Sequence, residues 1–256
     1  MITWRFPLSS RILRPLLWRC PEWWVLVLSA AAWIFFVVDG FWYRPFEEAN
    51  SHMWMGRMYH TVPSPGILHA LDGAVSAAIL HWPVMIAAMM FPLLVGQLRV
   101  VAARSLWSRR NRAMAFFLSG YTLPWLLYGL AVEVCRQTTA LSSFSPLLPL
   151  CLLSAAAWQL SPLKRRSLVS CHLTMPLAPS GWRSDFDCCR YGVRIAMSCS
   201  LSCWVLMLTC VAAYHALWAM LVVTAVAWLE RLLRRPRQIW IATALVGVAL
   251  CAARTA

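Results

Sequence analysis

Charged residues are scarce in this chain, and acidic ones are scarcest. Only 12% of the 256 residues are charged while 61% are hydrophobic, and 9 Asp and Glu stand against 23 Lys and Arg. A chain with so few charges cannot cover a water-facing surface without leaving large apolar patches. The composition therefore excludes an ordinary soluble domain and indicates that the bilayer is the main solvent.

Familiar catalytic motifs are also missing. The sequence has no Gly-rich phosphate loop ending in Lys-Ser or Lys-Thr, no HExxH segment and no Ser nucleophile elbow. Neither a Pro/Gly/Ser-rich linker nor an obvious internal repeat divides the chain. We therefore expect a non-enzymatic protein with a single transmembrane domain over residues 1–256.

Apolar runs, in contrast, are abundant. A helix needs about 20 apolar residues to cross the hydrocarbon core, and somewhat fewer where the bilayer thins. The predicted fold class is all-α, a polytopic bundle of about seven transmembrane helices. The predicted helices cover residues 23–38, 74–98, 113–134, 147–163, 193–213, 216–229 and 239–253.

The basic residues alternate between loops in the way that this helix count requires. Cytoplasmic loops of membrane proteins are enriched in Arg and Lys, which predicts an N-terminus inside and a C-terminus outside. The largest cytoplasmic loop would be residues 164–190 and an outer loop residues 42–72. We expect the basic stretches to meet anionic lipid headgroups rather than nucleic acid. The basic residues assigned to the outside are only Arg44, Arg57, Arg136 and Arg254.

Soft metal ligands recur at helical spacing on two predicted helices. Residues four apart lie on one helix face, and antiparallel helices would bring the two rows to a similar depth. Thioether and imidazole groups suit copper, particularly Cu(I), although Met and free Cys also serve as ordinary packing residues. The candidate metal ligands are His81, Met85, Met89 and Met90 on one helix, and Cys199, Cys203 and Met207 on the other.

The predicted outer loop holds a second group of Met and His residues. Such a segment resembles one that captures copper arriving from the periplasm, and it equally fits an amphipathic helix at the membrane surface. Its residues are His52, Met53, Met55, Met58 and His60.

Several short motifs follow one another from the second predicted helix to the sixth. They are Met85 to Pro92, Gly120 and Tyr121 with Trp125, Gln159 to Lys164, Cys199 with Cys203 and Trp204, and Glu230. In combination they resemble a bacterial family of unknown function, described as predicted metal-binding integral membrane proteins.

The resemblance implies that Cys171 joins the Met and Cys rows in a metal-handling centre. The chain also departs from the family, because Ser167 and Ser202 stand where the family tends to have cysteines. Three interpretations stay open. The chain is a factor that binds or delivers copper, a metal-depleted accessory subunit of a larger membrane complex, or a membrane enzyme with an unrecognised site. In the first two cases we expect other membrane subunits as partners.

Overall fold

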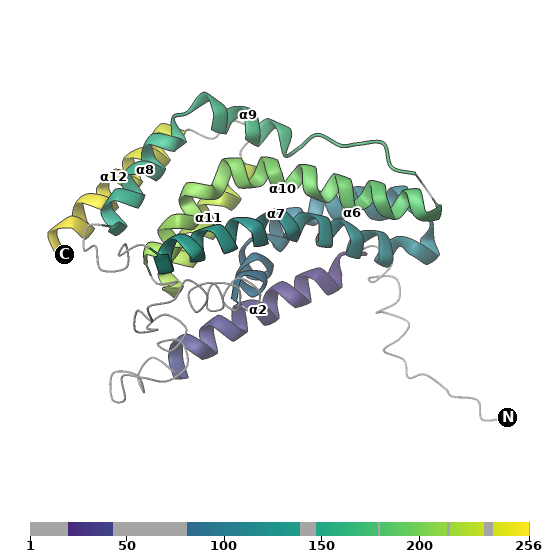
Figure 1. Ribbon diagram of the computed structural model, residues 1–256, viewed down its shortest axis with the longest axis horizontal. Coiled ribbons are helices and arrows are strands. Elements are labelled where there is room, and N and C mark those ends of the chain that lie inside the picture. The colour runs from purple at the N-terminus through teal and green to yellow at the C-terminus, as the bar shows by residue number, and fades with distance from the viewer. Residues whose placement is uncertain are drawn as a thin grey trace.

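The computed structural model describes residues 20–42, 81–138, 147–178, 180–213, 216–232 and 238–255. Most residues in these ranges are helical and none lies in a strand, which confirms the all-α class (Figure 1). The elements are α2 (Trp23–Trp42), a helix over His81–Met89, η1 (Phe91–Leu94), α6 (Val95–Arg104), η2 (Trp107–Arg109), α7 (Arg110–Thr138), α8 (Leu147–Gln159), α9 (Pro162–Ser170), α10 (Gly181–Ala212), α11 (Leu217–Leu232) and α12 (Gln238–Thr255).

Two described helices are long and apolar enough to cross a membrane, Trp107–Cys135 and Gly181–Ala212. A third candidate is the pair His81–Met89 and Phe91–Arg104, which are bent by 52° relative to each other. Shorter apolar helices occur at Trp23–Val38, Leu148–Gln159 and Trp240–Cys251. The described residues thus hold two or three candidate spans, while seven crossings and their orientation stay predictions.

The prediction of one continuous helix over residues 74–98 is wrong. Its described part breaks at Met90, and the short 3₁₀ turn that follows has Pro92 near its start. Pro lacks a backbone N–H and clashes with the preceding turn of an α-helix, so an apolar run that contains it need not stay straight. The chain resumes as α6, and Met90 becomes the corner between the two pieces.

The predicted boundaries around residues 147–190 also need correction. The helix predicted over residues 147–163 ends at Gln159, because Ser161 caps a new helix, α9, with its hydroxyl oxygen 3.2 Å from the Leu163 N–H. Pro162 then occupies the first turn of α9, where it costs no hydrogen bond.

The predicted cytoplasmic loop is mostly helical, since α10 begins at Gly181 rather than at residue 193. Its polar first turns are fixed to the preceding region by ion pairs. Asp185 accepts from Arg109 at 2.9 Å and from Arg112 at 2.8 Å, and Arg109 also donates to the Gly181 carbonyl at 3.1 Å.

Helices α7 and α10 run side by side along much of their length (Figure 1). Their backbones meet at two glycines. A Cβ atom on Gly120 would overlap the Cys189 carbonyl, and one on Gly192 would overlap the Phe117 carbonyl. Small residues allow this close approach between apolar helices.

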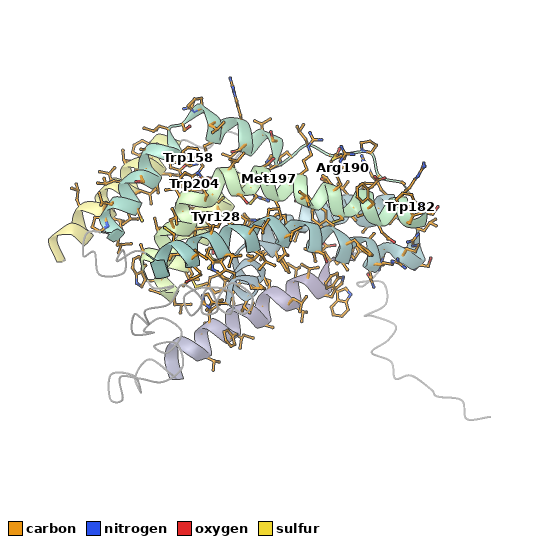
Figure 2. The ribbon with its side chains drawn as sticks, viewed as in Figure 1. Tyr128, Trp158, Trp182, Arg190, Met197 and Trp204 are labelled. Carbon is orange, nitrogen blue, oxygen red and sulfur yellow. The ribbon has the colours of Figure 1, made fainter. Side chains whose placement is uncertain are left out.

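The broken helix packs against both α7 and α2. The rings of Trp82 and Tyr128 lie edge to face at 5.6 Å, and the Ser29 hydroxyl of α2 donates to the Ala88 carbonyl at 3.1 Å. Figure 2 shows the side chains of Tyr128, Trp158 and Trp204 toward one end of this helical assembly. These contacts hold the Met-bearing helix beside α7.

Candidate metal centre

Helix α10 carries a row of sulfur atoms on its buried face. Cys199, Cys203 and Met207 follow at intervals of four residues, and all three side chains are buried. The spacing of these residues predicts this shared face, and the structure confirms it.

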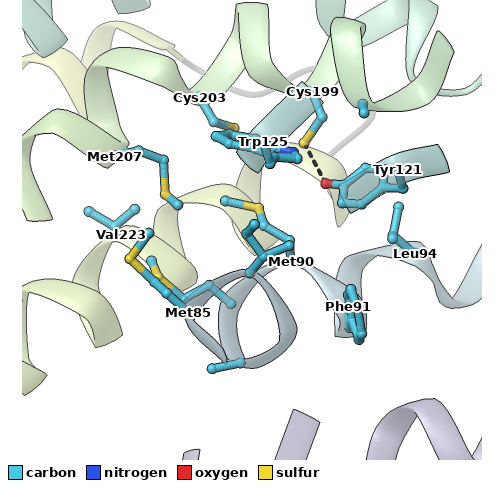
Figure 3. Close-up of a cluster of buried hydrophobic side chains, with 14 of the residues drawn as sticks. Met85, Met90, Phe91, Leu94, Tyr121, Trp125, Cys199, Cys203, Met207 and Val223 are labelled. Atoms are coloured by element: carbon cyan, nitrogen blue, oxygen red, sulfur yellow. Dashed lines mark hydrogen bonds between the residues drawn. The ribbon is translucent and has the colours of Figure 1, made fainter. Parts of the chain in front are cut away.

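The methionines of the broken helix form the opposite side of the same region. Met85, Met89 and Met90 are fully buried, and the side chains of Met85 and Met90 point toward the interior region that Cys203 and Met207 also face (Figure 3). We call Met85, Met89, Met90, Cys199, Cys203 and Met207 the sulfur cluster.

Two donors from other helices converge on the first thiol of the row. The Tyr121 hydroxyl of α7 donates to Cys199 Sγ at 3.2 Å, and Arg231 Nη2 of α11 donates to the same sulfur at 3.0 Å. Hydrogen bonds from a cation to an anionic acceptor are stronger than neutral ones. Cys199 Sγ is therefore an atom well placed to carry negative charge.

The second thiol lies beside a hydroxyl. Ser202 Oγ is 3.3 Å from Cys203 Sγ, while the same hydroxyl donates to the Cys199 carbonyl at 2.8 Å. The Cys203 and Cys199 thiols are themselves within hydrogen-bonding range of each other. Two thiols one helical turn apart can bind one ion between them.

A third thiol approaches from the turn after α9. Cys171 is fully buried, and it interacts electrostatically with Cys203 and Arg231. Burial raises the pKa of the Cys171 thiol to about 11, although the nearby guanidinium opposes this shift. The structure thus places Cys171 near the centre that the family resemblance implies, as a neutral thiol at pH 7.

Behind Cys203 lies a buried ion pair. Lys164 Nζ is 2.8 Å from Glu230 Oε1, and Gln159 Nε2 donates to the same oxygen at 2.8 Å. Both charged side chains are almost fully buried, at 0% and 1% exposure. Both groups interact electrostatically with Cys203.

Sequence reasoning missed the roles of these polar residues. It assigned Lys164 and Arg231 to cytoplasmic loops, and it noted Tyr121, Gln159 and Glu230 only as motif positions. The signal in the sequence is that lysine occurs only once, since Lys164 is the one lysine among 23 basic residues. A lone lysine beside an apolar run is a candidate for a buried pair.

Of the remaining predicted ligands, the structure describes only His81. His81 is buried with 8% exposure, and its ring packs edge-on against Phe36 of α2 at 5.4 Å. The predicted outer capture segment, with His52, Met53, Met55, Met58 and His60, lies outside the described residues.

The donor set fits one kind of metal better than others. Among the described residues no group of three or more His, Cys, Asp or Glu side chains is arranged to hold an ion. Structural zinc needs four such ligands in a tetrahedron. Cu(I) accepts soft thiolate and thioether sulfur, so two thiols and neighbouring methionines match it.

These features define an all-helical protein with apolar helices long enough to cross a membrane and a buried cluster of thiols and thioethers. The chain belongs to the family described as PpoB2, copper chaperone, whose model matches residues 79–255. Neither a comparison with curated proteins nor one with solved structures gives a match. Membership of a copper-related family agrees with the soft-metal chemistry expected from the sequence.

Proposed function

We propose that this protein is a non-enzymatic membrane factor that binds Cu(I) at the sulfur cluster and supplies it to a partner protein. The observation that carries the proposal is the row of Cys199, Cys203 and Met207, buried and facing Met85 and Met90. Membership of a family described as copper chaperones supports it independently. Soft sulfur ligands select copper over harder cations.

Each part of the cluster would have a distinct task. Cys199 and Cys203 would bind the ion directly, because a thiol that loses its proton is the strongest ligand present. The thioethers of Met85, Met90 and Met207 would complete the coordination. They are neutral ligands that bind more weakly than thiolates, so the ion can be released. Tyr121 would orient Cys199 through its hydrogen bond.

Copper titration of the purified full-length chain tests the proposal. Under reducing conditions, dialysis against buffered Cu(I) should leave one copper atom per chain, measured by elemental analysis beside protein concentration. A chain that stays free of copper in this experiment and purifies in fixed ratio with a larger complex would contradict the proposal.

We place this protein in the bacterial inner membrane with seven crossings, the N-terminus inside and the C-terminus outside. The distribution of basic residues supports this arrangement. A reporter fused after Ala256 should be active only in the periplasm. Cytoplasmic activity of that fusion would remove one crossing from the arrangement.

A second candidate function is that of an accessory subunit that has lost its metal. The observation in its favour is that two buried serines stand where the family that the sequence resembles tends to have cysteines. Ser167 and Ser202 are both buried, and each hydroxyl donates to a backbone carbonyl of its own helix at 2.8 Å. Hydroxyls satisfied in this way contribute nothing to binding a soft ion, and the copper titration separates the two candidates.

A further inference from the structure

Arg231 occupies an unusual position at the end of α11. Its Nη1 donates to the Leu93 carbonyl at 3.0 Å, in the 3₁₀ turn where the Met-bearing span breaks, and its Nη2 donates to Cys199 Sγ at 3.0 Å. One guanidinium thus joins α11, the helix break and the thiol row of α10. Arginine stays protonated in proteins, so it brings a fixed positive charge to the cluster.

That charge lacks the balance that other charges near the thiols have. Lys164 and Glu230 cancel each other in their ion pair. Within the described residues, no ion pair joins a carboxylate to Arg231. The partner that its geometry offers is the sulfur of Cys199.

We infer that Arg231 makes the sulfur cluster selective for a monovalent soft ion, because its charge balances two thiolates that hold one Cu(I). This inference rests on the proposed function and names the charge class of its ligand. Each thiol that binds the ion releases its proton to solvent. Two thiolates with a monovalent ion carry a net charge of −1, and Arg231 brings the total to zero.

A divalent ion at the same two thiolates gives a different total. The thiolates and the ion cancel, which leaves the charge of the partly buried Arg231 guanidinium without a counterion, and such a charge is costly. A third thiolate would restore neutrality, yet the described residues provide no three-ligand arrangement. Arg231 therefore weakens the binding of Zn(II) and Cd(II) at the two thiolates and strengthens the binding of Cu(I) and Ag(I).

The test compares Ag(I) with Cd(II), because neither ion changes its oxidation state in the experiment. The full-length chain in lipid nanodiscs is titrated with each ion, and the ratio of the two affinities is measured for the wild type and its variants. We expect the wild type to prefer Ag(I), and we expect Arg231→Gln to reduce this preference about 10- to 100-fold through loss of a nearby unit charge. Arg231→Lys should keep most of the preference, since it keeps the charge.

The matched control is Arg109→Gln, which removes another partly buried guanidinium at a site where Asp185 keeps Arg112. It should leave the ratio unchanged. Equal losses for both ions in Arg231→Gln, or an altered ratio in Arg231→Lys, would show that Arg231 is only structural. If Arg231→Gln does not fold, the wild type alone still tests the inference. A wild type that binds Cd(II) as tightly as Ag(I) overturns the inference. A wild type that binds neither ion overturns the proposed function itself.

Discussion

Replacing Cys199 and Cys203 together by alanine should abolish stoichiometric Cu(I) binding while leaving the protein folded. Loss of an outer-shell partner alone typically costs about 10- to 100-fold in metal affinity, so loss of both thiolates should exceed about 100-fold. Each substitution removes a small buried side chain, which costs about 1 to 2 kcal/mol of stability. Copper per chain is measured by elemental analysis after dialysis, and folding by size-exclusion profile and thermal unfolding.

Cys210→Ala is the matched control for this experiment. Cys210 lies on the same helix, two turns beyond Cys203, and it is fully buried. The control should bind copper like the wild type, because Cys210 is not part of the sulfur cluster. Retention of one copper per chain by Cys199→Ala/Cys203→Ala would remove the cluster from consideration as the metal centre.

Lys164→Met should destabilise the protein by about 3 to 5 kcal/mol, because it leaves the carboxylate of Glu230 buried without its cation. Methionine is close to lysine in shape, so the loss of packing is small. The expected result is a large drop in the unfolding temperature of the purified protein, measured by the fluorescence of its tryptophans. The buried thiols, unlike the exposed Cys135 and Cys251, should become accessible to a maleimide reagent at the same lower temperature.

The double variant Lys164→Met/Glu230→Gln should recover much of this loss, since the neutral amide can keep its hydrogen bond with Gln159. The control is Arg112→Gln. Arg112 is 60% exposed and Asp185 retains Arg109, so this change should cost less than about 1 kcal/mol. A double variant as unstable as Lys164→Met would mean that packing, rather than the ion pair, holds this region.

The sequence predicts the helices well where they are uniformly apolar. Residues 216–229 and 239–253 correspond closely to α11 and α12. The start of α10 could not be found in this way, because hydropathy reports affinity for lipid. The first turns of α10 are polar, and ion pairs from Asp185 to Arg109 and Arg112 hold them in place.

The sulfur row of α10 was predictable from spacing, since helical periodicity alone places Cys199, Cys203 and Met207 on one face. The groups that surround it were not. The bonds from Arg231 and Tyr121 to Cys199, and from Lys164 to Glu230, each join two different helices, across 32, 78 and 66 residues respectively. Spacing within one helix carries no information on such pairs, and the charge pattern of the loops gives no sign that Lys164 is buried.

Gly120 and Gly192 limit how this protein can move. Since any Cβ at either position would collide with a carbonyl of the facing helix, the two backbones lie in direct contact and cannot slide past each other by a turn. Helices α7 and α10 therefore form one mechanical unit that keeps Tyr121 and Cys199 in register. On the proposed function, the opening that admits or releases an ion is expected in the other walls of the cluster, where the span is bent by 52° at Met90.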